Sequence, residues 1–315
     1  MKKKQITILT ILTLFITLLF VFSLSTISAA DQTIDNSTGI STGITNTGNE
    51  ETLTLQEGIY NKSTDHGITI NKNITIQGNT STNNVIIDAQ GLTRIFTISN
   101  NRNVVFINLT FINGYTTANG GAIYNNYANS KITFINCNFI NNTANNGGVI
   151  YNVGNSLLVF NSTFTDNILL SNYGGAIYNS GSDFSVSDST FENNVAGSRG
   201  GAIYNNGGNS FSVVNSTFID NSANQGGAIY NNGIDFSVSN STFIGNNASF
   251  DGGAIYNSGT NSSVSDSTFK NNTAYNYGGA IRNSGGNVSV INLTFIDNFA
   301  NRGGAIYNTG GNSSV

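Results

Sequence analysis

The sequence predicts an all-β protein, a right-handed, single-stranded parallel β-helix with about 26 residues per coil. Two motifs return at a fixed interval, the apolar residues between them alternate with period two, and no repeat carries the apolar stripe of a helix. Only 9% of residues are charged and Pro is absent, a composition that approaches disorder. The regular recurrence of Ile, Val, Phe and Tyr nevertheless supplies the apolar surface that a fold must bury.

The first motif is Gly-Gly-Ala-Ile-Tyr-Asn, with two variants: residues 147–152 carry Val in place of Ala, and residues 278–283 carry Arg in place of Tyr. The steps between successive copies are 27, 27, 26, 26, 26, 26 and 25 residues. This period is too short for a helix pair and has no Leu-x-x-Leu-x-Leu pattern of a leucine-rich repeat. The motif begins at Gly120, Gly147, Gly174, Gly200, Gly226, Gly252, Gly278 and Gly303.

The second motif, Phe-x-x-Asn, lies near the middle of each period, first at Phe139 and last at Phe295. Each period divides into three short strands, for example residues 228–230, 236–238 and 241–244, separated by Gly, Asn and Ser corners. Three strands and three corners make one coil, whose strands pair in parallel with those of the neighbouring coils about 4.8 Å away.

Equivalent residues stack in columns. The Ile of the first motif never changes, and neither does the Phe of the second, so both columns are expected inside. The residue after Ile is Tyr in seven copies and Arg282 in the eighth, and strand alternation then turns this column outward. The Asn of Phe-x-x-Asn is expected at a corner, in left-handed backbone and in an amide ladder. The Gly pair suits positive φ or close approach between coils.

The amino terminus resembles a secretory signal peptide over residues 1–30, with three lysines, an apolar stretch and Ser28-Ala29-Ala30 before the expected cleavage after Ala30. The apolar stretch is also long enough to allow an uncleaved membrane anchor. Residues 31–51 lack periodicity and are predicted to be a flexible spacer. Residues 52–119 are predicted to form an N-terminal cap and irregular opening coils, and residues 120–315 the regular coils, which end halfway through a coil like a truncated product.

The paired motifs resemble the repeats of chlamydial polymorphic outer-membrane proteins and, in their Asn-rich setting, the adhesin-like surface proteins of methanogenic archaea. The resemblance covers residues 52–315 and implies a pectate-lyase-like solenoid, secreted or displayed at the cell surface and used in attachment. The implied partners are extracellular glycans, surface proteins of other cells and the cell envelope. A passive stalk or coat of the envelope is the alternative function, and a polysaccharide lyase or hydrolase is a rival class.

Charge excludes nucleic acid as an expected partner, because the formal charge of −4 becomes −7 when the three lysines of the leader are removed. No cofactor is expected. The candidate ligand-binding residues form the outward ladder, whose stacked phenols could receive sugar rings or a protein partner, or could simply pack on one another. These residues are Tyr124, Tyr151, Tyr178, Tyr204, Tyr230, Tyr256 and Tyr307.

No catalytic or metal-binding residue is expected, so the chain is predicted not to be an enzyme. Asp166, Asp220 and Asp297 are expected to share one column with Glu192, Asn193, Gly245 and Asn271. Asp188 and Asp266 are expected to alternate with Asn in another column, which indicates that both columns tolerate any polar residue. The best remaining acid–base pair is Asp88 with Arg94, expected on the surface of an early coil.

The lone cysteine and histidine also have ordinary explanations. Cys137 replaces the Ser of other repeats, and His66 is expected in a solvated corner without a second metal ligand. Asn-x-Ser/Thr sites such as Asn161, Asn215 and Asn240, together with Asn261 and Asn292, are candidate glycan acceptors on an exported protein.

Overall fold

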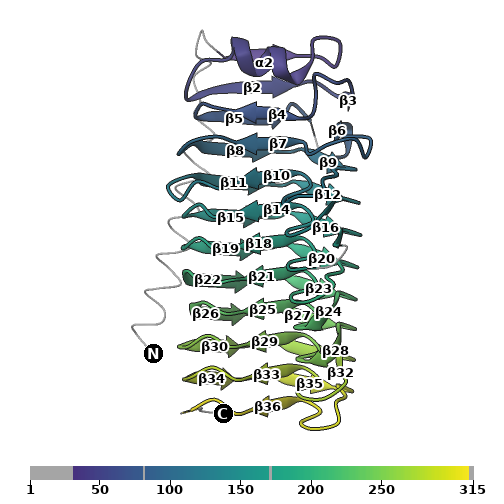
Figure 1. Cartoon of the computed structure of the whole chain (residues 1–315), viewed down its shortest axis with the longest axis vertical. Helices are drawn as coiled ribbons and strands as arrows, with labels where there is room; N and C mark the ends of the chain where they lie inside the picture. Colours follow the sequence, from purple (N-terminus) through teal and green to yellow (C-terminus); the bar gives the residue numbers. More distant parts are fainter. Residues whose placement is uncertain (1–30, 81, 170–171, 312–315) are drawn as a thin grey trace.

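The computed structural model describes residues 31–80, 82–169 and 172–311, and its strands stack as a parallel β-solenoid (Figure 1). The predicted signal peptide, residues 1–30, lies outside the described residues. Each strand pairs in parallel with its equivalents in the coils before and after it, with identical motif residues in register, such as Tyr204 against Tyr230. The predicted parallel β-helix with coils of about 26 residues is therefore confirmed.

Each regular coil gives one strand to each of three sheets, which we call the Tyr sheet, the long sheet and the Phe sheet in the order in which the chain visits them. The Tyr sheet comprises β4 Ile68–Ile70, β7 Phe96–Ile98, β10 Ile123–Asn125, β14 Ile150–Asn152, β18 Ile177–Asn179, β21 Ile203–Asn205, β25 Ile229–Asn231, β29 Ile255–Asn257, β33 Ile281–Asn283 and β36 Ile306–Asn308.

The long sheet comprises β1 Gln32–Ile34, β2 Glu51–Leu55, β5 Ile74–Gly78, β8 Asn103–Ile107, β11 Lys131–Ile135, β15 Leu157–Phe160, β19 Phe184–Ser187, β22 Asn209–Val214, β26 Ile234–Ser239, β30 Ser262–Ser265 and β34 Val288–Ile291. The Phe sheet comprises β3 Gly58–Tyr60, β6 Val85–Asp88, β9 Thr110–Ile112, β12 Asn138–Ile140, β16 Thr163–Thr165, β20 Thr190–Glu192, β23 Thr217–Ile219, β27 Thr242–Ile244, β31 Thr268–Lys270 and β35 Thr294–Ile296.

Two small sheets lie between the Phe sheet and the next Tyr-sheet strand. They are formed by β13 Thr143–Ala144 with β17 Ile168–Leu169, and by β24 Ser222–Gln225, β28 Asn247–Asp251 and β32 Thr273–Ala274. One 3-10 turn, η1 Thr82–Asn84, precedes β6.

The flexible spacer predicted for residues 31–51 is wrong. Strand β1 extends the long sheet by pairing with β2, and helix α2, Ile40–Asn46, lies across the first coil (Figure 1). Ile40 and Ile44 are buried, and the Asp65 carboxylate accepts a hydrogen bond from the Ile40 amide at 2.8 Å. A three-residue strand and a seven-residue helix are too short to reveal a period, which is why the sequence pattern gave no sign of this cap.

The core consists of the columns expected inside. The Ile of each Ile-Tyr-Asn strand is buried from Ile123 to Ile281, and the phenylalanines of the Phe sheet stack face to face along the solenoid. The rings of Phe218 and Phe243, for example, are 4.8 Å apart and inclined by 4°. Stacked identical side chains bury apolar area in every coil, and this burial is the main source of stability.

The Asn of Phe-x-x-Asn forms the predicted amide ladder, but the left-handed residue is its neighbour. The ladder runs through buried Asn142, Asn167, Asn194, Asn221, Asn246 and Asn272, each of which donates its Nδ2 to Oδ1 of the next. Positive φ falls one position earlier, for example at Asn193 (55°) and Asp220 (51°). At each corner, therefore, one residue adopts the left-handed backbone and the next residue forms the amide ladder.

The Gly pair likewise divides its work. The first glycine adopts positive φ, as in Gly226 at 63°. The second lies against the next coil: a Cβ on Gly227 would be 2.1 Å from the carbonyl oxygen of Gly253. Both explanations offered for the pair are confirmed, one for each glycine.

Candidate binding face

The Tyr column lies on the outer side of the Tyr sheet, between the buried Ile and Asn of each strand. Its rings stack from coil to coil over an unbroken run of six, Tyr124 to Tyr256, with centroid separations of 4.7 to 5.5 Å. Arg282 then occupies the column, followed by Tyr307. All seven candidate tyrosines are thus brought together on one face.

The column is less exposed than the sequence suggested. Only 5% of Tyr204 and 6% of Tyr230 is exposed, so the outward-facing column is covered at these two residues. The reason is a second ring, Tyr173, which stacks on Tyr204 at 4.8 Å, and the Arg199 guanidinium, which lies 4.8 Å from the Tyr230 ring centroid. The other five tyrosines of the column remain partly exposed.

Tyr173 and Arg199 belong to a second outward column, formed by the residue before each Gly pair. Coil-to-coil bridges join its members, such as Tyr173 with Arg199 and Asp251 with Tyr277. The column contains, in order, Asn119, Asn146, Tyr173, Arg199, Gln225, Asp251, Tyr277 and Arg302. Because its residues change from coil to coil, the repeat pattern did not single it out.

Four of the five arginines in the sequence contact rings on this face. The Arg94 guanidinium lies 4.7 Å from the Tyr124 ring centroid, and Arg302 lies 5.8 Å from Tyr277. Arg282 lies among three rings, nearest to Tyr307 at 4.9 Å. We call the two columns with Arg94 the Tyr–Arg face. Such cation–π contacts hold the guanidinium groups at the surface.

Burial favours the neutral form of three phenols in the middle of the column, those of Tyr151, Tyr178 and Tyr204. Burial, helped by the neighbouring phenols of Tyr151 and Tyr204, raises the pKa of Tyr178 to about 12. Burial likewise raises the pKa of Tyr151 and of Tyr204. Some hydroxyls are engaged by the following corner: Tyr204 donates to Oδ1 of Asn206 at 2.8 Å, and Tyr178 accepts from Nδ2 of Asn206 at 2.8 Å.

The acidic columns are explained by backbone conformation. Asp166, Asp220 and Asp297 share their column with Asn and Gly, and its members have φ between 50° and 65°. Asn, Asp and Gly are the residues that tolerate left-handed backbone, so the column is restricted to these three. The prediction that it tolerates every polar residue is therefore wrong. Glu192 is not in it: it pairs with Thr165 and Ile219, one position earlier.

The remaining candidates have separate partners. Asp88 accepts hydrogen bonds from Asn113 and the Gln90 amide, while Arg94 donates to the Gly120 and Asn119 carbonyls, so the suggested acid–base pair is not formed. No group of three or more His, Cys, Asp or Glu side chains among the described residues is placed to hold a metal ion.

The lone histidine and cysteine are both buried. His66 is 8% exposed and neither ring nitrogen has a hydrogen-bond partner, so the solvated corner predicted for it is wrong. Cys137 occupies the Ser column, since its amide donates to Ser162 Oγ at 3.1 Å, and burial raises its thiol pKa to about 12. A neutral buried thiol is a poor nucleophile.

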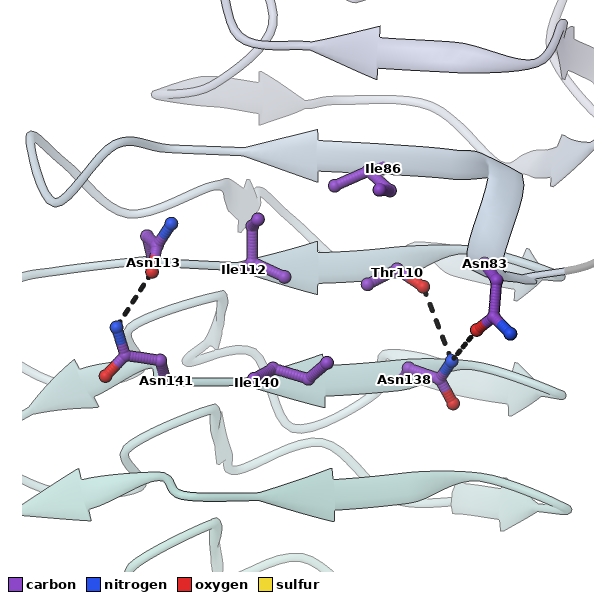
Figure 2. A pocket seen from close by; sticks show the side chains of 8 residues that line it. All are labelled: Asn83, Ile86, Thr110, Ile112, Asn113, Asn138, Ile140 and Asn141. Atoms are coloured by element: carbon purple, nitrogen blue, oxygen red, sulfur yellow. Dashed lines mark hydrogen bonds between the residues drawn. The ribbon is translucent and has the colours of Figure 1, made fainter.

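Sequence reasoning missed one depression, of about 440 Å³, on the outer side of the Phe sheet (Figure 2). Its floor is formed by Ile86, Ile112 and Ile140 from successive coils, and two rows of polar residues border it. In one row Asn141 donates to Oδ1 of Asn113 at 2.8 Å. The signal available in the sequence was the Ile that follows Phe111 and Phe139, whereas Ile86 pairs with Thr110 and follows no Phe.

A family model described as the Chlamydia polymorphic membrane protein repeat matches residues 188–206, 215–232, 240–258, 266–284 and 292–309. The chain therefore contains repeats of this type, arranged as a β-solenoid, whereas the similarity to methanogen adhesins remains an expectation. No curated protein matches the chain. No helix among the described residues is long and apolar enough to cross a bilayer.

Two solved structures are similar in fold. The PL6 family alginate lyase AlyGC is 13% identical, with a TM-score of 0.45, over 82% of this chain and 44% of that chain. A mannuronic acid specific polysaccharide family 6 lyase from human gut microbiota is 11% identical, with a TM-score of 0.32, over 84% of this chain and 82% of that one. This chain thus spans less than half of the first enzyme. At these identities the likeness concerns the fold alone.

Proposed function

We propose that this chain of polymorphic-membrane-protein-type repeats is an exported, surface-displayed attachment protein without enzymatic activity. Its Tyr–Arg face contacts extracellular glycans or surface proteins of other cells. The observation that carries the proposal is the Tyr ladder with its four arginines, which runs along one side of the solenoid. Aromatic rings with polar tips and arginines are the groups enriched where proteins recognise partners.

Surface display is supported by the repeat type, whose description names a membrane protein, and by the leader-like residues 1–30. The absence of enzymatic activity is proposed because positive φ accounts for the Asp columns and the histidine and cysteine are buried. Asn-x-Ser/Thr sites at exposed corners, such as Asn215 and Asn240, are compatible with export and with glycosylation.

A passive stalk or coat is the second candidate function. It is favoured by the fact that the same rings pack on one another and that some hydroxyls are already bonded to neighbouring corners. In an attachment protein the Tyr–Arg face binds a ligand, whereas in a passive stalk or coat it only stabilises the fold.

The test is attachment of the full chain to a glycan panel and to whole cells, comparing wild type with the double variant Tyr151→Ser/Tyr256→Ser. Both rings are partly exposed, so their loss removes contact area while the Ile and Phe columns remain. The matched control is Ile140→Ser/Ile244→Ser on the outer side of the Phe sheet. Attachment lost only in the Tyr variant, with melting temperatures of both variants similar, supports the proposal. If wild type and both variants all fail to attach, the result favours the passive stalk or coat.

A further inference from the structure

We infer that the ligand of the Tyr–Arg face is an anionic polysaccharide, bound through Arg199, Arg282 and Arg302. This inference rests on the proposed attachment function and specifies its ligand class. Four arginines gather on one face of a chain whose formal charge is negative. The chain without its leader lysines carries a formal charge of −7, yet the Tyr–Arg face holds four arginines and, within its two columns, one acidic residue, Asp251. The face is a basic strip on an acidic protein.

The guanidinium groups of Arg199 and Arg282 donate hydrogen bonds to neutral acceptors. Among the described residues, Arg199 contacts neutral groups: its Nε donates to the Gln225 amide oxygen at 3.2 Å, and its guanidinium lies over the Tyr230 ring. Nη1 of Arg282 donates to the Asn283 carbonyl at 2.6 Å, while its Nε is buried without a partner. A guanidinium has five N–H donors, so neutral acceptors leave both its charge and part of its donor capacity available. Carboxylate and sulfate groups match that fork.

Aromatic rings and guanidinium groups repeat along the solenoid axis. Arg199 and Arg282 lie three coils apart, about 14 Å at the usual strand spacing, and Arg302 follows in the next coil. Between them the rings of Tyr230 and Tyr256 stack 4.8 Å apart. A ligand that lies along this line contacts tyrosine rings and arginines in alternation. A complementary ligand should therefore be a polymer whose units carry both a sugar ring and an anionic group. A polysaccharide of uronic acid or sulfated sugar units does so.

The experiment uses two matched polymer pairs: polygalacturonate with its fully methyl-esterified form, and dextran sulfate with dextran. The pairs share a backbone and differ in charge, so they separate carboxylate from sulfate recognition. Wild type is expected to bind at least one anionic polymer and to lose affinity as salt is added. Binding to neither anionic polymer, or equal binding to the charged and neutral members of each pair, overturns the inference. Equal binding of charged and neutral polymers would leave the proposed attachment function standing while excluding an anionic ligand. Binding to cells but to none of the polymers would likewise exclude the anionic polysaccharide and keep the attachment function.

The variants are chosen from residues that the columns already contain. Arg199→Gln introduces the side chain found at Gln225, and Arg282→Tyr restores the residue of the other seven copies. Each is expected to weaken binding of the anionic polymer about tenfold, the effect of losing one charge-assisted contact. Exposed Arg302→Gln provides a third variant in case one of the others unfolds. The control, Lys131→Gln/Lys270→Gln, removes two positive charges from exposed positions on the other sheets. An equal loss in this control would mean that only net charge matters and would overturn the assignment.

Discussion

Asn221 donates its side-chain Nδ2 to Oδ1 of Asn246 at 3.0 Å, and both side chains are fully buried. The same Nδ2 donates to the Phe191 carbonyl at 2.9 Å, and the Asn221 amide donates to Asn246 Oδ1 at 3.1 Å. A single carboxamide thus satisfies backbone groups of its neighbours at a corner that has no regular strand pairing. The polar ladder is as much a part of the core as the Phe ladder beside it.

Replacing Asn221 by Ala should lower the free energy of unfolding by about 1–3 kcal/mol, because buried donors and acceptors in two neighbouring coils lose their partner. Urea unfolding followed by circular dichroism measures the change. Exposed Asn224→Ala is the control, with an expected change within about 0.5 kcal/mol. Equal effects of the two substitutions would show that the ladder is dispensable.

Phe218→Ala should cost about 3–5 kcal/mol, since it opens a cavity between the stacked rings of Phe191 and Phe243. The same substitution at Phe250, which is 51% exposed, should cost far less. Thermal melting of the two variants makes the comparison. A small loss at Phe218 would contradict the assignment of this column to the core.

Gly227→Ala should prevent the coil from closing, because the added Cβ would lie 2.1 Å from the Gly253 carbonyl oxygen, which belongs to the backbone and cannot move aside. We expect loss of soluble folded protein or a large drop in melting temperature. Gly286→Ala serves as control, since its Cβ would meet only the Thr260 methyl group at 3.5 Å. Normal stability of Gly227→Ala would show that coil spacing is looser than described.

Alkaline pH should destabilise the fold. The folded-state pKa of Tyr178, raised to about 12 chiefly by burial, exceeds its unfolded value of about 10. The stability that this difference reflects is fully present below pH about 10 and is lost as pH rises towards 12, because the unfolded chain ionises first. Melting temperature measured across this range should fall less steeply in Tyr178→Phe than in wild type. Identical slopes would exclude a contribution from this phenol.

Substitutions at Asp166, in the column with positive φ, test whether backbone conformation or the acidic side chain selects the residues of this column. Asp166→Asn should be neutral, whereas Asp166→Val should cost about 1–2 kcal/mol, because a β-branched residue resists the φ of 56° found there. Chemical unfolding measures both. Similar stability of the Asn and Val variants would mean that backbone conformation does not select these residues.

The regular coils could be predicted from the sequence because stacking places identical residues in one environment. An Ile or Phe that never changes must be inside, and Arg282 in the Tyr column marked the outer side. The cap of residues 31–51 could not be predicted, since one short strand and one short helix carry no period. His66 was misplaced because it precedes the regular coils, where no column defines its environment.

The candidate face was only half predicted. The Tyr column follows from the motif, but the neighbouring column with Tyr173 and Arg199 varies from coil to coil and appears only once the corner is folded. The sequence offered one sign of this face, since three of the arginines occupy two positions of the repeat. Arg199 and Arg302 precede a Gly pair, and Arg282 lies within the motif. Ring-to-guanidinium contacts across coils required the structure.

Hydroxyl-radical footprinting of the full chain, with and without a polysaccharide that it binds, shows directly whether the Tyr–Arg face is the binding surface. We expect the ligand to protect Tyr151, Tyr178 and Tyr256 from oxidation, while the exposed side chains of Ile59 and Leu92, at 52% and 68%, react as before. Protection of Ile112 and Ile140 instead, in the depression on the Phe sheet, with unchanged reactivity of the tyrosines, would contradict this expectation.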